Sequence, residues 1–288
     1  MPEMPEVQGL VDFLGERAVG HAITRTSVGE IAALKTYDPP NTALHGATIT
    51  ATARYGKFVD IACGDDLHLV FHLAKAGWLR WYDALPTTLI KPGRSPIALR
   101  IALDDGSGFD LTEAGTKKSL AIYVVRSPAD VPGIATLGPE PMSDDFTVDV
   151  LGRILEEAGR KQLKGVLRHQ GTIAGIGNAY SDEILHAARM SPYKPADSLS
   201  EEELQTLYAV LRGTLADAVA RSTGLAASEL KGEKKSHLAV HGRTGLPCPV
   251  CGDIVREVSF ADSSLQYCPT CQTGGKPLAD RRMSKLLK

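Results

Sequence analysis

Short apolar blocks, either alternating with polar residues or continuous, fill the chain up to residue 125. Residues two apart share one face of a strand, so these blocks predict strands at 47–56, 57–63, 67–73, 97–103 and 119–125. One helical segment, Val7–Arg17, precedes them. Polar turns at 63–66 and 104–108 separate strands at hairpin spacing. The pattern predicts an antiparallel β-sandwich with a flanking helix.

After residue 145 the apolar spacing becomes helical. It predicts helices within 149–169, 178–190 and 200–221. Ser200 and Glu203 stand three residues apart, as in a capping box, and mark the start of the last helix. The preceding stretch 126–145 is rich in proline and glycine and is the predicted linker. The fold class is therefore α+β, with strands first and helices second.

Four of the five cysteines form two C-x-x-C pairs, Cys248 with Cys251 and Cys268 with Cys271. Two such turns can close a tetrahedral thiolate shell around one zinc ion, which would be structural because no position stays open. The segment between the pairs reads as two short strands around a turn at 261–264. Two disulfides are the alternative, but they belong to oxidising compartments and the chain shows no sign of secretion.

Length and composition suit two domains: 288 residues, 43% hydrophobic and 23% charged. The net charge of −2 is unpromising for a nucleic-acid binder, yet residues 231–288 carry ten Lys/Arg against five Asp/Glu. This basic end is compatible either with a phosphate-binding face or with a solvated tail. We find no apolar run long enough for a membrane span and no signal peptide at the start, and we expect a cytoplasmic protein.

A glycine-rich turn lies between two predicted helices. Gly175 and Gly177 allow a backbone turn to approach a phosphate closely, and Asn178 opens a helix whose free N–H groups favour an anion. Taken alone this signal is weak, because glycine-rich helix starts are common.

The turn becomes informative as one of four motifs that occur in order along the chain. They are MPEMPEV at the start, RYGK at 54–57, GIGNAYSDEIL at 175–185, and a finger HGRTGLPCPVCG…YCPTCQ at 241–272. Together they resemble the formamidopyrimidine-DNA glycosylase/endonuclease VIII family over essentially the whole chain. The resemblance implies a β-sandwich catalytic domain, a helix–two-turn–helix domain and a zinc finger, with DNA in the cleft between the domains. On this chain the β-sandwich domain would span 1–125 and a linker 126–145. The helix–two-turn–helix domain would span 146–235, the zinc finger 236–275 and a basic tail 276–288.

The resemblance also implies catalytic roles for the N-terminus. Removal of Met1 would expose the secondary amine of Pro2, and an α-amine with a pKa near 8 is partly neutral and nucleophilic at pH 7. Pro2 matches the family's nucleophile, which attacks the sugar C1′, and Glu3 matches the general acid/base. Further matches are a supporting carboxylate, a catalytic lysine that contacts phosphates beside the lesion, and a phosphate-binding asparagine: Glu6, Lys57 and Asn178.

The chain departs from the family pattern on the side that contacts DNA. The finger arginine five residues before the third cysteine is replaced by Ser263, beside Asp262, and a hydroxyl cannot supply a charged clamp. Lys75 occupies the place of a methionine that fills the gap left by the extruded base, and an arginine–phenylalanine pair has no counterpart. We therefore expect other cations to bind DNA: Lys75, Lys117, Lys118, Arg281 and Arg282.

These features predict a base-excision glycosylase with abasic-site β/δ-lyase activity, which extrudes the nucleotide from the stack. The expected partner is damaged or abasic DNA, duplex or single-stranded, bound by a monomer at the nucleoid. The alternative is a binder of damaged or abasic DNA on the same fold with little or no glycosylase activity. A zinc-ribbon protein that binds another protein would explain the cysteines but neither Pro2-Glu3 nor the two-turn motif.

Overall fold

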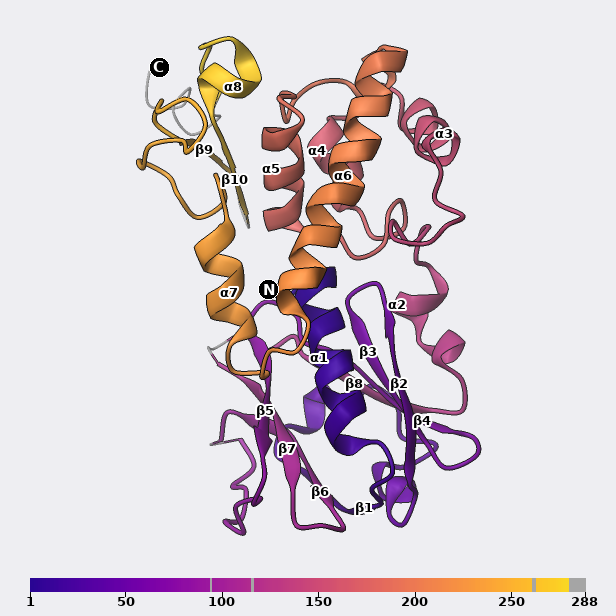
Figure 1. The fold of residues 1–288 in the computed structure, drawn as a ribbon. Helices are drawn as coiled ribbons and strands as arrows, with labels where there is room; N and C mark the ends of the chain where they lie inside the picture. Colours follow the sequence, from indigo (N-terminus) through magenta and orange to yellow (C-terminus); the bar gives the residue numbers. More distant parts are fainter. Residues whose placement is uncertain (94, 115–116, 261–262, 280–288) are drawn as a thin grey trace. The chain divides into compact units, whose positions relative to one another are not determined.

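The computed structural model describes residues 1–93, 95–114, 117–260 and 263–279 (Figure 1). Their contacts divide the chain into two compact units. The first is Met1–Leu137 with Val219–Glu233, and the second is Gly138–Ala218 with Lys234–Lys288. The domain boundaries expected from the sequence stay a prediction.

The first unit is built mainly from strands. They are β1 (Ile23–Val28), β2 (Ile49–Tyr55), β3 (Phe58–Cys63), β4 (Leu67–His72), β5 (Gly77–Tyr82), β6 (Ile97–Leu103), β7 (Gly108–Glu113) and β8 (Ala121–Val125). Helix α1 (Met4–Ala18) precedes them, and α2 (Pro132–Ala135) follows.

The strands form two antiparallel four-stranded sheets, in the orders β1-β6-β7-β5 and β2-β3-β4-β8. Buried side chains from both sheets, among them Ile61 and Phe71 of one and Ile101 and Phe109 of the other, pack with α1 in a single core. The predicted antiparallel β-sandwich with a flanking helix is therefore confirmed, and the five predicted strands correspond to β2, β3, β4, β6 and β8.

Three strands, β1, β5 and β7, were not among the strands predicted from the sequence, and in β1 and β7 polar residues interrupt the apolar pattern. In β7 the carboxylate of Asp110, with 0% of the residue exposed, accepts two hydrogen bonds from Arg100 of β6 at 2.7 and 2.8 Å. A buried charge is tolerated when it is paired and hydrogen-bonded in this way. The polar residue Asp110 is therefore the reason why β7, an inner strand of its sheet, was not predicted from the sequence.

The second unit is mainly helical. It contains α3 (Val148–Ala158), α4 (Leu163–Arg168), α5 (Asn178–Ala187) and most of α6 (Glu201–Ser222). Helix α7 (Leu230–His237) was not predicted: of its eight residues the structure buries Leu230, too little for an apolar periodicity. The finger has strands β9 (Arg256–Ser259) and β10 (Ser264–Tyr267) and the short helix α8 (Pro269–Thr273).

Local signals fix the ends of these helices. The predicted helical run 149–169 is two helices, because Gly159 has a φ of +59° and ends α3. The Ser200 capping box is confirmed: its N–H donates to the Glu203 carboxylate at 2.9 Å, and its hydroxyl accepts from the Glu203 N–H at 3.2 Å. Among the described residues, none of the helices combines the length and apolar character that crossing a bilayer requires.

Candidate active site and zinc centre

The predicted catalytic residues at the start of the chain lie at the N-terminus of α1, where Pro2 and Glu3 precede the helix and Glu6 is in its first turn. Pro2 is buried, and Glu3 and Glu6 are 2% and 1% exposed. The backbone N–H of Glu3, the residue before the helix, donates to the Glu6 carboxylate at 2.8 Å. The helix dipole also favours a negative charge at this end. Ordinary chain termini fray, whereas this one is fixed by a buried carboxylate.

Two hydrogen bonds set the direction of α1 along β2. Thr52 donates to the carbonyl of Val11 at 3.0 Å, and Arg54 donates to the side chain of Gln8 at 2.9 Å. The chain of α1 therefore runs opposite to β2, and its N-terminus points toward the turn that joins β2 to β3. Lys57, the other predicted catalytic residue, lies in that turn and is 5% exposed.

The register of the strands places the predicted DNA-binding lysines of this unit at the same end of the sandwich. Phe58 of β3 faces His72 of β4, which faces Ala121 of β8, so Lys57 and the turns after β4 and before β8 lie together. In the other sheet Gly77 faces Glu113, which brings the turns after β4 and after β7 side by side. The cations that these turns carry are Lys75, Lys117 and Lys118, all exposed.

The turn after β4 is tight. Ala74 adopts a φ of +50°, and a Cβ on Gly77 would lie 2.1 Å from the Leu73 carbonyl oxygen, so position 77 requires glycine. The turn after β7 is held by the buried Glu113 carboxylate, which accepts the N–H groups of Ser119 at 2.8 Å and Leu120 at 3.1 Å. These contacts hold the backbone on either side of the exposed lysines in defined positions.

His72 adds a neutral imidazole to this end of the sandwich. Burial, and then the positive charge of Lys57, lower the pKa of His72 from 6.5 to about 4. Its Nδ1 accepts the N–H of Ala74 at 3.2 Å, and its ring lies 4.8 Å from that of Phe58. Because Nδ1 is an acceptor, the neutral ring carries its proton on Nε2.

In the second unit, the two-turn motif is folded around Gln170. The Gln170 side chain donates to the Ile176 carbonyl at 2.6 Å and accepts the Gly175 N–H at 3.1 Å, where Gly175 has a φ of +82°. Asn178 then opens α5, as the sequence predicts. Its side-chain amide donates to the Ser264 carbonyl of the finger at 2.7 Å, while its buried Oδ1 has no hydrogen-bond partner among the residues that the structure describes.

Two acidic residues further along the same motif, Asp182 and Glu183, join α5 to the finger. Asp182, with 0% exposed, accepts from Lys164 at 2.6 Å and from the Gln266 N–H at 3.2 Å, and contacts His241 Nδ1 at 2.7 Å. Glu183 accepts the backbone N–H groups of residues 239, 240 and 241 at 2.7, 3.0 and 2.8 Å. Burial raises the pKa of Glu183, and these hydrogen bonds partly oppose that effect.

Ser263, which stands where the family's finger carries an arginine, lies next to an arginine from α4. The guanidinium of Arg168, at the end of α4, lies 3.4 Å from the Ser263 hydroxyl. Lys234 of α7 also approaches α5, with its ammonium 4.6 Å from the ring centre of Tyr180. Neither cation was predicted from the sequence, because each meets its neighbour only in the fold; Arg168 and Ser263, for example, are 95 positions apart. Arg281, Arg282 and Asp262 lie outside the described residues.

The four predicted zinc ligands come together as expected. Cys248 and Cys271 have their sulfurs 3.9 Å apart, and Cys251 and Cys268 have theirs 3.4 Å apart. A tetrahedral shell with Zn–S bonds of about 2.3 Å needs sulfurs roughly 3.8 Å apart, so the thiols fit a zinc ion. Zinc would be a structural ion here, tying β10 and α8 to the loop at 248–251.

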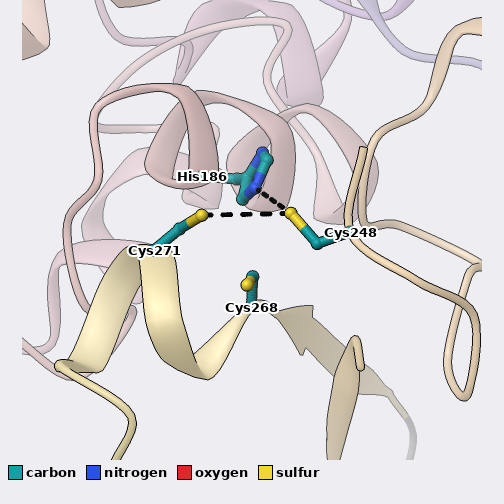
Figure 2. Close-up of side chains that lie close together, drawn as sticks. All are labelled: His186, Cys248, Cys268 and Cys271. Carbon is teal, nitrogen blue, oxygen red and sulfur yellow. Dashed lines mark hydrogen bonds between the residues drawn. The ribbon is translucent and has the colours of Figure 1, made fainter. Parts of the chain in front are cut away.

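A fifth group, His186 of α5, lies beside these thiols and was missed from the sequence. Its Nε2 lies 3.3 Å from the Cys248 sulfur (Figure 2). No spacing rule links a histidine to cysteines 62 residues away. The helical motif that carries Asn178 also carries His186, two turns further on.

Comparison with known proteins agrees with this arrangement. The chain matches the formamidopyrimidine-DNA glycosylase N-terminal domain over residues 1–118, the formamidopyrimidine-DNA glycosylase H2TH domain over 137–229, and the zinc finger found in FPG and IleRS over 245–274. These three parts define the architecture of a zinc-finger DNA glycosylase.

Individual proteins extend the match to nearly the full length. A formamidopyrimidine-DNA glycosylase of Symbiobacterium thermophilum is 35% identical over 294 residues, which cover 98% of this chain and 93% of that protein. An uncharacterized formamidopyrimidine-DNA glycosylase-like protein of Mycobacterium tuberculosis is 59% identical over 160 residues, 56% of this chain and 99% of that protein. The chain belongs to the formamidopyrimidine-DNA glycosylase family of DNA-repair enzymes.

Solved structures show the same fold. Lactococcus lactis Fpg (MutM), in complex with DNA that contains N7-benzyl-Fapy-dG, has a TM-score of 0.83 and 27% identity, over 94% of this chain and 100% of that chain. The MutM (Fpg) protein from Thermus thermophilus has a TM-score of 0.80 and 33% identity, over 96% and 100%. The predicted helix–two-turn–helix domain and zinc finger are therefore confirmed.

The low pKa of His72 predicts a loss of stability in acid. Between the folded pKa of about 4 and the usual 6.5, the unfolded chain binds a proton at this position that the folded chain does not. The free energy of unfolding should therefore fall as the pH drops from 6.5 to 4, by up to roughly 3 kcal/mol from this one group. His72→Gln, which keeps an acceptor for the Ala74 N–H, should flatten the curve. Denaturant unfolding of both proteins across this pH range measures the difference, and parallel curves would contradict the assignment.

Proposed function

We propose that this DNA-repair glycosylase uses the amine of Pro2 as a nucleophile and combines base excision with abasic-site lyase activity. The observation that carries the proposal is the fixed N-terminus. Pro2 and Glu3, which precede α1, and Glu6 in its first turn are all buried, at the end of the sandwich that also carries Lys57. A binding protein without catalysis has no need to bury two carboxylates beside its N-terminal amine.

Removal of Met1 is the first requirement, because the Pro2 nitrogen is otherwise an amide. Met1 is 45% exposed, whereas the residue behind it is buried, so the first residue offers an accessible end for processing. The resulting secondary amine has a pKa near 8, about two units below that of a lysine, and is partly neutral at pH 7.

The reaction then proceeds at the sugar C1′ of an extruded nucleotide. The Pro2 nitrogen forms a bond to C1′, the bond from C1′ to the base breaks, and Glu3 acts as proton donor at the sugar oxygen. The amine proton is then lost, and the bond from C1′ to the ring oxygen breaks as that oxygen takes the proton from Glu3, which opens the sugar and leaves an iminium at C1′. The iminium acidifies the C2′ proton and permits elimination of the 3′ and then the 5′ phosphate. Lys57 and neutral His72, which lie at the same end of the sandwich, would contact those phosphates as donors.

DNA backbone contacts would come from both units. Lys75, Lys117 and Lys118 supply cations at the catalytic end of the sandwich. In the second unit, the N-terminus of α5 with Asn178 offers an anion site, and Arg168 supplies a guanidinium at the finger position held by Ser263. Arg168 therefore replaces the clamp that the sequence lacks at Ser263, and it joins the predicted Arg281 and Arg282 as a candidate.

Borohydride trapping on a duplex with one abasic site tests the chemistry, since borohydride reduces an iminium to a stable amine. Protein that begins at Pro2 should form a covalent adduct, and protein that retains Met1 should not. Glu3→Gln should lower excision of a damaged base by about 100-fold or more while binding the same duplex as tightly. Tight, salt-dependent binding with no adduct from any form would leave a damage-binding protein on this fold.

Removal of the proposed backbone contacts should weaken binding to every sequence alike. Arg168→Ala and Lys75→Ala should each reduce affinity for abasic duplex and lower the salt dependence by about one counterion. Arg17→Ala is the matched control, since this exposed arginine pairs with Asp83 at the opposite end of α1. Fluorescence anisotropy at several salt concentrations measures both quantities. If a variant shows the same affinity and salt dependence as the Arg17→Ala control, the residue that it replaces does not contact DNA.

A further inference from the structure

His186 lies inside the zinc centre and not merely near it. Its ring nitrogen and the sulfurs of Cys248, Cys268 and Cys271 all lie within 4.8 Å of one another. His186 is 4% exposed and projects from α5 into the space between Cys248 and Cys271 (Figure 2). This group of four is itself a complete zinc-ligand set of the three-cysteine, one-histidine type.

The distances suit ligation as well as hydrogen bonding. Zn–N and Zn–S bonds of about 2.0 and 2.3 Å at a tetrahedral angle place nitrogen and sulfur roughly 3.6 Å apart. The Nε2 of His186 lies 3.3 Å from the Cys248 sulfur. The separation of this nitrogen and this sulfur is therefore close to that of two ligands on one zinc ion.

Cys251 differs from the other three thiols. It is exposed, whereas Cys248 and Cys268 are 3% and 0% exposed. It also stands outside the group that contains His186, because its sulfur does not lie within 4.8 Å of all the other members. Cys251 is thus the thiol that solvent reaches most easily, and His186 approaches the three remaining thiols from the interior, on α5.

We propose that His186 is a reserve zinc ligand, so that this centre holds its metal either through four cysteines or, when Cys251 is unavailable, through Cys248, Cys268, Cys271 and His186. The three shared thiolates form one face of both tetrahedra. The two sets differ in their fourth ligand alone, which would be the Cys251 thiolate in one and the His186 imidazole in the other. The protein would then keep the finger folded after the exposed thiol is modified.

Zinc content and cobalt spectra of full-length variants test the proposal. Cys251→Ala should retain one zinc ion per chain, with affinity reduced by about 10- to 100-fold. Its cobalt-substituted form should show the weaker sulfur-to-metal charge-transfer absorption and shifted d–d bands of three sulfurs and one nitrogen. Cys268→Ala, whose thiol belongs to both sets, is the matched control and should lose the metal.

His186→Phe separates the reserve ligand from the four-cysteine set. Alone it should keep one zinc ion, because the cysteines suffice, but combined with Cys251→Ala it should abolish stoichiometric zinc binding. Equal zinc retention by Cys251→Ala with and without His186, or loss of zinc from Cys251→Ala itself, would overturn the proposal.

A second measurement avoids the folding of cysteine variants. Limited alkylation of the folded zinc protein with N-ethylmaleimide should modify Cys251 first and release no zinc. In His186→Phe the same first alkylation should release the ion, which a chromogenic chelator detects. Identical zinc release from the two proteins would also overturn the proposal.

Discussion

The hydrogen bond from the Glu3 N–H to the buried Glu6 carboxylate is the constraint on which the proposed chemistry depends. A carboxylate out of water is costly unless it is hydrogen-bonded, so the first turn of α1 cannot fray without exposing Glu6 and losing this contact. Pro2 is thereby held two residues before a fixed helix start, next to Glu3. The bonds from β2 to α1 direct that start toward Lys57, and strand register brings the exposed lysines to the same end.

In the second unit, too, buried carboxylates fix backbone by accepting hydrogen bonds from N–H groups, and there they hold the zinc finger. A finger of about forty residues has too small a core to fold alone and needs metal or other strong contacts. Here its core cluster is Val240, Val255 and ligand cysteines, and the Asp182 and Glu183 carboxylates hold its backbone on α5. Helix α5 therefore carries three groups with different tasks: Asn178 at its N-terminus, the acidic pair in its first turns, and His186 at the zinc centre.

Much of this could be predicted from the sequence, because the signals were local. Five strands, the β-sandwich, the Ser200 capping box and the cysteine quartet follow from periodicity, capping and spacing. Strand β7 was missed because its partner Arg100 neutralises a buried Asp110, which a one-dimensional pattern records as polar. His186 and Arg168 were missed for another reason: each acquires its role from a residue 62 or 95 positions away, and only the fold creates those contacts. The roles of Pro2, Glu3 and Lys57 remain predictions.

Mapping the bond between protein and DNA tests the central claim most directly. The borohydride-reduced adduct with an abasic oligonucleotide can be digested with nuclease and protease and sequenced by tandem mass spectrometry. We predict that the residual sugar fragment is carried by the nitrogen of Pro2, on a peptide that begins PEMPEVQGL. A fragment carried by a lysine side chain, such as that of Lys57 or Lys75, would contradict it.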